Sequence, residues 1–170
     1  VRSARICVSP AARWAVLAGN FMDSNTAADL GLVTHLVDIS EVDSTIQSIA
    51  TMGKPSNKYP GKPSNPQSKV AIFAEAFYSD ANLESVLSGN CPDGFDSEDR
   101  NVSRQIKSLS RTAPIALAMA SDLINIASET TLSEGLAKEL ENLEKIFSTD
   151  DALEGLSALI EGRKPTYQNS

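Results

Sequence analysis

The side chains best suited to chemistry are few, and they lie far apart in the sequence. The chain contains one histidine, His35, and two cysteines, Cys7 and Cys91. A histidine-based triad needs a nucleophile and a carboxylate beside the imidazole, and nothing in the sequence places such groups next to His35. We therefore interpret His35 as a structural residue. A thiolate at Cys7 would be favoured near a helix start, but a small buried thiol is the better interpretation.

Charged residues cluster at the two ends of the last expected helix. Asp150, Asp151 and Glu154 crowd its beginning, where acidic side chains complement the helix dipole. A metal ion would need further oxygen ligands from elsewhere in the chain, so we predict no metal site. Arg163 and Lys164 follow the end of this helix. Cations occur there for structural reasons, and they could also recognise a phosphate.

The composition excludes several classes of protein. The chain has 170 residues, 41% of them hydrophobic, and a net charge of -7. A protein that binds nucleic acid by bulk electrostatics needs clustered Lys and Arg, and no apolar run approaches the ~20 residues of a membrane span. Two cysteines are too few for a disulfide scaffold or a zinc site and favour a reducing compartment. We expect a cytoplasmic protein without nucleic-acid or membrane partners.

Motifs for phosphate or cofactor binding are also absent from the sequence. It contains no G-x-S-x-G elbow, no Walker loop and no dinucleotide-binding fingerprint. We therefore predict no cofactor bound by this chain itself. From the residues alone, the sequence describes an acidic helical domain of unassigned function.

The elements that must position these residues are all helices. Ser9 and Pro10 are typical of a helix start, as is the sequence Thr-Ala-Pro at 112–114. The sequence Thr-Leu-Ser-Glu at 131–134 predicts a capping box before a long apolar stripe. Thr149 is expected to cap the last helix. The predicted fold class is mostly α, with little room for a sheet.

Composition divides the chain into four regions. Short helices are expected in residues 1–50. Residues 51–69 contain the pentapeptide GKPSN twice, and four prolines without aliphatic residues at 53–68 predict a flexible linker that proteases cut first. A helical insert is expected at 70–110. Residues 111–170 should form a C-terminal region of three helices.

Two stretches resemble the crotonase family, also called the enoyl-CoA hydratase/isomerase family. AVLAGNFMDSNTAADLGLV at residues 15–33 is similar to a family turn and short helix that end in "GLV". Residues 112–167 resemble the family's C-terminus more specifically, through TLSEGL, FSTDDALEGL and EGRKP. Several signals thus occur in the family's order and spacing. The resemblance implies the C-terminal helical region of a crotonase-like fold, without the N-terminal ββα spiral.

The resemblance also implies which parts of the active site to expect here. In the family, the spiral binds acyl-CoA, two backbone N–H groups form an oxyanion hole, and two glutamates handle the water and the proton in hydratases. When this sequence is aligned without gaps to the family pattern, Arg2 and Arg5 fall on two arginines that follow the second catalytic glutamate. We therefore expect the catalytic groups upstream of Val1, and we assign no catalytic residue in this chain.

The family's C-terminal helices oligomerise, cover the acyl pocket and contribute to the CoA site. Leu159 stands where an aromatic residue typically meets the adenine, and Gly162 stands where a lysine typically meets a phosphate. These two departures leave Arg163 and Lys164 as the CoA-binding candidates. We expect a homo-oligomer that packs on an upstream crotonase core and acts on a coenzyme A thioester.

The resemblance leaves three functional hypotheses open. The first is part of an enoyl-CoA hydratase, and the long middle region is similar to archaeal-type fusions with an NAD-dependent 3-hydroxyacyl-CoA dehydrogenase. In that case NAD would belong to the additional domain. The second is a 3-hydroxyisobutyryl-CoA hydrolase-like enzyme, because that group also carries a helical insert. The third is a non-catalytic assembly module.

Overall fold

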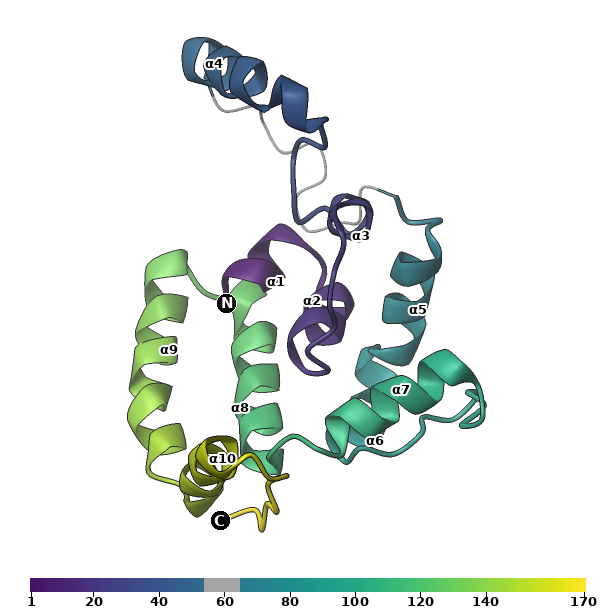
Figure 1. The fold of residues 1–170 in the computed structure, drawn as a ribbon, viewed down its shortest axis with the longest axis vertical. Helices are drawn as coiled ribbons and strands as arrows, with labels where there is room; N and C mark the ends of the chain where they lie inside the picture. The colour runs from purple at the N-terminus through teal and green to yellow at the C-terminus, as the bar shows by residue number, and fades with distance from the viewer. Residues whose placement is uncertain (54–64) are drawn as a thin grey trace.

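The computed structural model describes residues 1–53 and 65–170 of the chain (Figure 1). These residues form helices without any strand, as the sequence predicted. None of the helices in the described ranges is both long enough and apolar enough to cross a membrane. In chain order the helices are α1 (Arg2–Ile6), α2 (Ser9–Val16), α3 (Ser24–Asp29), η1 (Ile39–Glu41), α4 (Val42–Met52), α5 (Lys69–Phe77), η2 (Asp80–Asn82), α6 (Leu83–Leu87), α7 (Arg100–Leu109), α8 (Pro114–Asn125), η3 (Ile126–Ser128), α9 (Leu132–Phe147) and α10 (Asp150–Glu161).

Local capping chemistry explains where the last two helices begin and end. The hydroxyl of Thr131 accepts a hydrogen bond from the Glu134 amide at 3.3 Å, and the Glu134 carboxylate accepts one from the Thr131 amide at 2.7 Å. This reciprocal pair confirms the predicted capping box. Thr149 caps α10 by accepting from the Ala152 amide. Gly162 ends α10 in the left-handed conformation, with φ at 68°.

The helix at Ser9 begins one residue earlier than its sequence suggested. Val8 occupies the N-cap position, and Ser9 already lies inside α2. The reason is a backbone contact, because the amide of Ala12 donates to the carbonyl of Val8 at 3.0 Å. Ser9 therefore makes no side-chain cap, and Pro10 occupies the first turn without losing a required hydrogen bond.

The core lies among the helices on both sides of α2. Helix α2 packs against α5 and α8, and α6 packs against both α7 and α8. The fully buried side chains come from these helices and from the ends of α1, α3 and α5. They include Cys7, Ala12, Leu30, Phe77, Tyr78, Val86 and Leu109. The insert expected at 70–110 is therefore part of the same core as α2 and α8.

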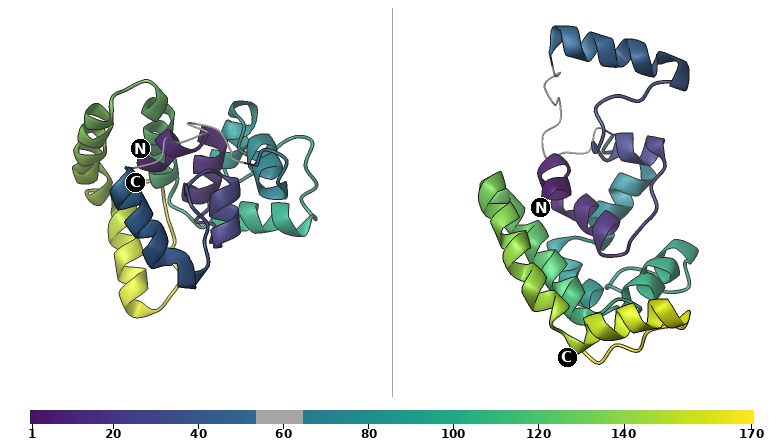
Figure 2. Two further views of the ribbon diagram at one scale, coloured as in Figure 1. Left: turned by 90° about the horizontal axis from the view of Figure 1, so that it is seen from above. Right: turned by 60° about the vertical axis from the view of Figure 1, so that its left-hand side comes forward.

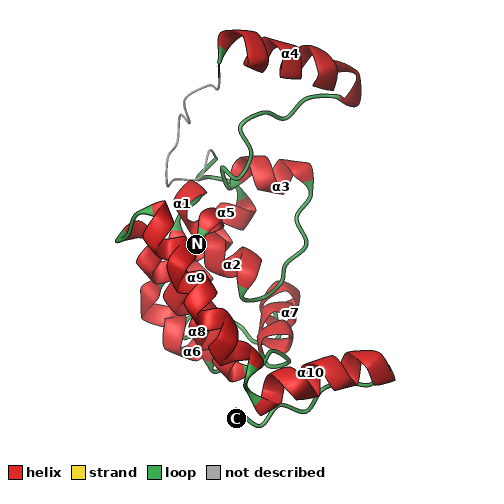
Figure 3. Ribbon diagram, turned by 90° about the vertical axis from the view of Figure 1, so that its left-hand side faces the viewer, coloured by secondary structure: helices red, strands yellow, loops and turns green. Residues whose placement is uncertain are grey.

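Among the described residues, α9, α10 and α4 with η1 lie outside this core. Helix α9 packs along α8, α10 contacts the end of α9, and α4 stands apart from the rest of the molecule (Figures 1 and 2). Figure 3 shows α10 and α4 extending from opposite ends of the body. Much of the linker predicted at 51–69 falls on residues 54–64, which lie outside the described residues. Of its margins, Thr51 and Met52 belong to α4, and Lys69 begins α5.

A buried arginine on α2 contacts the segment after α5 and the end of α8. Arg13 on α2 is 2% exposed. Its guanidinium donates to the carbonyl of Tyr78 at 2.9 Å and to the side-chain oxygen of Asn125 at 2.7 Å. It also forms an ion pair with Asp80 at 2.7 Å. A buried charge needs such partners, so Arg13 fixes α2 against η2 and α8.

A second buried contact set holds α7 against the loop after α2. Gln105 accepts hydrogen bonds at its side-chain oxygen from the Tyr78 hydroxyl and from the Asn20 amide group, both at 2.7 Å. The Gln105 amide group donates back to the Asn20 side-chain oxygen at 3.1 Å. Burial raises the pKa of Tyr78, so its hydroxyl stays protonated and donates. These contacts fix the distance between α7 and residues 18–20.

Candidate functional site

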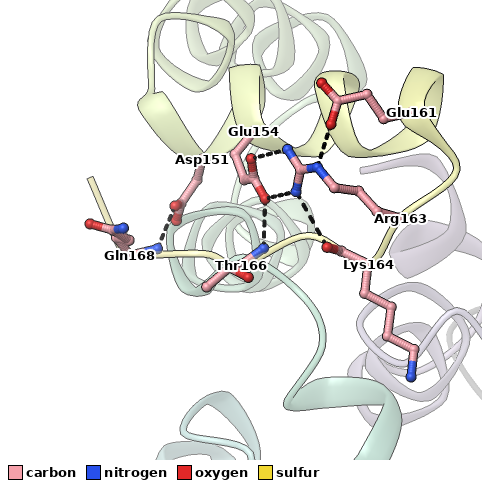
Figure 4. A network of polar contacts seen from close by, with 7 residues as sticks. All are labelled: Asp151, Glu154, Glu161, Arg163, Lys164, Thr166 and Gln168. Atoms are coloured by element: carbon pink, nitrogen blue, oxygen red, sulfur yellow. Dashed lines mark hydrogen bonds and ion pairs between the residues drawn. The ribbon is translucent and has the colours of Figure 1, made fainter.

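The chain after α10 folds back along that helix and is held there by three carboxylates of the helix. Arg163 donates to both oxygens of Glu154, at 2.6 and 2.7 Å, and to Glu161 at 2.5 Å (Figure 4). The amide of Thr166 also donates to Glu154 at 2.7 Å. The guanidinium of Arg163 is therefore engaged by carboxylates of its own chain.

The acidic residues at the start of α10 serve the same returning segment. The Asp151 carboxylate accepts hydrogen bonds from the amides of Gln168 and Asn169, at 2.7 and 3.0 Å. The hydrogen bonds from Arg163 and then from the Thr166 amide lower the pKa of Glu154 to about 2. Asp151 and Glu154 thus have a role beyond complementing the helix dipole.

Lys164 points away from these carboxylates, as Figure 4 shows. It lines a cleft of about 380 Å³ between the turn that precedes α8 and the returning C-terminal segment. We call this the tail cleft. Its other lining residues are Ser110, Arg111, Thr112, Pro114, Pro165, Thr166 and Tyr167. The prediction that Arg163 and Lys164 bind coenzyme A stays a prediction, and of the two Lys164 lines the tail cleft.

A second cleft adjoins the tail cleft through Arg111 and Thr112, which line both. It has a volume of about 520 Å³ and lies between α7 and residues 18–20. Arg104 and Lys107 of α7 and Arg111 of the turn that follows it line one side, and we call this the basic cleft. Sequence reasoning missed these three residues. Arg104 and Lys107 are three residues apart and share one face of α7, and Arg111 follows in the turn after that helix. The spacing of Arg104 and Lys107 was the available signal.

An apolar groove separates α8 from α9. Its volume is about 540 Å³, which is within the usual range for a small-molecule pocket. Arg2, Glu139 and Asn142 supply its polar groups. The remaining lining residues are apolar: Ala116, Met119, Ala120, Leu123, Leu136, Leu140, Leu143 and Ile146. The groove can accept an aliphatic chain or an apolar side chain of another segment.

The structure places the other candidate residues away from these clefts. Cys7 is fully buried, and burial raises the pKa of its thiol to about 11. The thiol is therefore protonated at neutral pH, which confirms its interpretation as a small buried residue. His35 is exposed, and its Nδ1 lies 2.9 Å from the Thr34 hydroxyl. Within residues 1–53 and 65–170, no group of three His, Cys, Asp or Glu side chains is arranged to hold a metal ion.

A family model described as enoyl-CoA hydratase/isomerase matches residues 5–170. Curated relatives match shorter stretches. A probable mitochondrial enoyl-CoA hydratase of Dictyostelium discoideum is 38% identical over 55 residues, 32% of this chain and 20% of that protein. A probable mitochondrial enoyl-CoA hydratase 2 of Arabidopsis thaliana is 39% identical over 59 residues, 35% of this chain and 20% of that protein. A probable enoyl-CoA hydratase of Mycobacterium leprae is 39% identical over 70 residues, 41% of this chain and 26% of that protein.

These matches cover about a fifth to a quarter of the relatives' own lengths. No solved structure matches this chain. The family match covers the core helices, the 70–110 helices and the returning C-terminal segment alike.

Proposed function

The chain belongs to the enoyl-CoA hydratase/isomerase family, and from that premise we propose that it is the C-terminal helical part of an enoyl-CoA hydratase. The observation that carries the proposal is the family match over residues 5–170, which includes the helices at 70–110. The curated relatives, each named as a probable enoyl-CoA hydratase, support the same reaction.

The reaction that this proposal implies is the addition of water across a trans-2-enoyl thioester. An oxyanion hole stabilises the thioester enolate, and two carboxylates supply general acid and base catalysis. Among the described residues that line the apolar groove, Glu139 is the sole carboxylate. In the family's hydratases two different carboxylates serve as general acid and general base, so Glu139 alone does not supply both. The proposal therefore assigns the catalytic pair and the oxyanion donors to a segment N-terminal to this chain.

Within that enzyme, the helices of this chain would bind and cover the acyl part of the substrate. Most of the residues that line the groove between α8 and α9 are apolar. Moving an acyl chain from water into this groove therefore lowers the free energy of the system. The exposed apolar faces of α9 and α10 fit contacts with a crotonase core or with further copies of the protein.

A hydrolase that acts on 3-hydroxyisobutyryl-CoA is the second candidate. The observation that favours it is the integration of α5, α6 and α7 into the core through Phe77, Val86 and Leu109, all at most 1% exposed. Such a packed helical insert is the feature by which the sequence resembles that group.

The experiment that tests the proposal uses the protein expressed from its complete gene, beside the 170-residue chain alone. Hydration of crotonyl-CoA is followed by the loss of enoyl-thioester absorbance. We expect turnover by the complete protein and none by the chain alone. Turnover by the isolated chain would refute the assignment of the catalytic groups to another segment.

The same samples distinguish the remaining hypotheses. Release of free thiol from 3-hydroxyisobutyryl-CoA, without hydration of crotonyl-CoA, would replace the hydratase proposal by the hydrolase. If the complete protein does neither, the chain is an assembly module. Reduction of NAD by the complete protein with 3-hydroxybutyryl-CoA would support a fused dehydrogenase.

A further inference from the structure

The first residues of the chain lie against the start of α9, 125 to 138 positions away in the sequence. The nitrogen of Val1 donates to a carboxylate oxygen of Glu139 at 2.9 Å. The guanidinium of Arg5 donates to the backbone carbonyls of Thr130 and Thr131, at 2.6 and 2.7 Å. Helix α1 also contacts η3, the short helix between α8 and α9. Separate polar contacts thus hold α1 against the joint between α8 and α9.

The two segments also approach closely at a glycine of α9. Gly135 is buried in the first part of that helix. A β-carbon at this position would lie 2.7 Å from Cγ1 of Val1 and 3.3 Å from Nη2 of Arg5. A glycine inside a helix destabilises that helix relative to alanine. The close approach of α1 therefore gives a physical reason for glycine at this position.

Glu139 lies one helical turn beyond Gly135, and it lines the apolar groove between α8 and α9. Arg2 lines the same groove, so the groove reaches the contact between Val1 and Glu139. The Glu139 side chain is 35% exposed. A partly buried carboxylate is stabilised by a hydrogen-bond donor, and the nitrogen of Val1 is such a donor. One carboxylate thus touches both the groove and the first residue of the chain.

We infer that Glu139 is a positioning residue for the hydration reaction, because it anchors residue 1 and thereby fixes the segment that precedes it. The inference rests on the proposed function, which assigns the catalytic carboxylates to that segment. In the complete protein the nitrogen of residue 1 is a peptide N–H, which still donates one hydrogen bond. The contacts of Gly135 and Arg5 do not depend on the charge of this nitrogen. Helix α9 thereby sets the distance between the apolar groove and the catalytic carboxylates.

This role uses the acceptor oxygen of Glu139 and not its proton. A glutamine at position 139 keeps an acceptor oxygen on a side chain of the same length, and an alanine removes it. The two substitutions therefore distinguish a positioning residue from a general acid or base, which loses its function in both.

Hydrogen exchange of the complete protein, read by mass spectrometry on peptides that span residue 1, tests the anchor without any substrate. Glu139→Ala should make exchange of these amides about tenfold faster or more, because the acceptor is lost. Glu139→Gln should leave it within about twofold. Glu144→Ala is the matched control, because Glu144 is exposed on the same helix and does not line the groove. Exchange in Glu139→Ala that equals the control would overturn the anchor.

Hydration of crotonyl-CoA by the same variants tests the consequence for catalysis. A displacement of about 1 Å can cost about a hundredfold in rate, so Glu139→Ala should lower kcat by up to that factor. Its KM should stay within about threefold, because the groove is retained. Glu139→Gln should keep the kcat and the pH profile of the unmodified protein. An equal loss of kcat in both variants would make Glu139 a proton-transfer group, and an unchanged kcat in Glu139→Ala would leave it without a positioning role.

Gly135→Ala tests the same contact from the other side. The added methyl group would displace Val1, whereas alanine raises the helix propensity of α9. We expect a lower kcat with unchanged far-ultraviolet circular dichroism. The double variant Val1→Ala/Gly135→Ala removes the methyl groups that the new side chain meets, so it should recover most of the lost rate. A loss that the double variant does not recover would contradict displacement of Val1 as its cause.

The two readouts separate this inference from the proposed function. If the complete protein does not hydrate crotonyl-CoA, the proposed function is wrong and the positioning role falls with it, whereas hydrogen exchange still decides whether Glu139 anchors residue 1. If the complete protein hydrates crotonyl-CoA, and Glu139→Ala exchanges and turns over as the unmodified protein does, the inference is wrong and the proposed function stands.

Discussion

The Glu154 carboxylate of α10 accepts hydrogen bonds from Arg163 and from the Thr166 amide of the returning C-terminal segment. Its protonation should therefore determine the pH at which this segment detaches from α10. Hydrogen bonds from Arg163 lower its pKa from 4.5 to about 2. A carboxyl with a lowered folded-state pKa stabilises the fold above its unfolded pKa, and this contribution disappears as the pH falls toward the folded value. We therefore expect the segment to be fully held above about pH 4.5 and to be held progressively less firmly as the pH falls from about 4.5 toward 2.

The carboxyl resonance of Glu154, followed by NMR against pH, measures this directly. In the unmodified chain its midpoint should lie near 2. The variant Arg163→Gln should move the midpoint toward the ordinary value, because the largest cause of the lowered pKa is then absent. An unchanged midpoint in that variant would contradict the assigned role of Arg163.

At the scale of the helix, local signals predicted the elements, and distant contacts escaped prediction. Thr131, Thr149 and Gly162 act on backbone groups within a few residues, so their roles can be recognised in the sequence. The partners of Arg13 at Tyr78 and Asn125 lie 65 and 112 positions away. No periodicity encodes such contacts. The ion pair that the fold forms between Glu154 and Arg163 was likewise not predicted, and the assignment of Arg163 as a coenzyme A ligand stays a prediction.

The capping box at the start of α9 offers a direct measurement of such a local signal. The variant Thr131→Ala removes the hydroxyl that accepts from the Glu134 amide, so urea unfolding should show a loss of about 1 kcal/mol. Ser133→Ala is the matched control, because Ser133 is exposed on the first turn of the same helix. Alanine has a higher helix propensity than serine, so the control should be neutral or slightly more stable. Equal losses in both variants would argue against the capping box.

At the scale of the whole molecule, α9 and α10 leave large apolar side chains exposed to solvent. Phe147 on α9 is 66% exposed, and Leu159 and Ile160 on α10 are 78% and 86% exposed. Exposed apolar side chains gathered on neighbouring helices drive association, because contact removes their surface from water. The sequence predicted these stripes as apolar, but it could not show that the chain itself leaves them uncovered.

We therefore expect the isolated chain to form a dimer or a larger species through α9 and α10. Light scattering coupled to gel filtration should give a mass at least twice 18.1 kDa. The double variant Phe147→Glu/Ile160→Glu should shift the mass toward the monomer, because burying an unpartnered carboxylate at the contact costs more than its apolar area returns. Met52→Glu on α4, where Met52 is 79% exposed, is the control and should leave the mass unchanged. A monomeric unmodified chain at high concentration would contradict the prediction, and an equal shift with Met52→Glu would assign the contact to α4 instead.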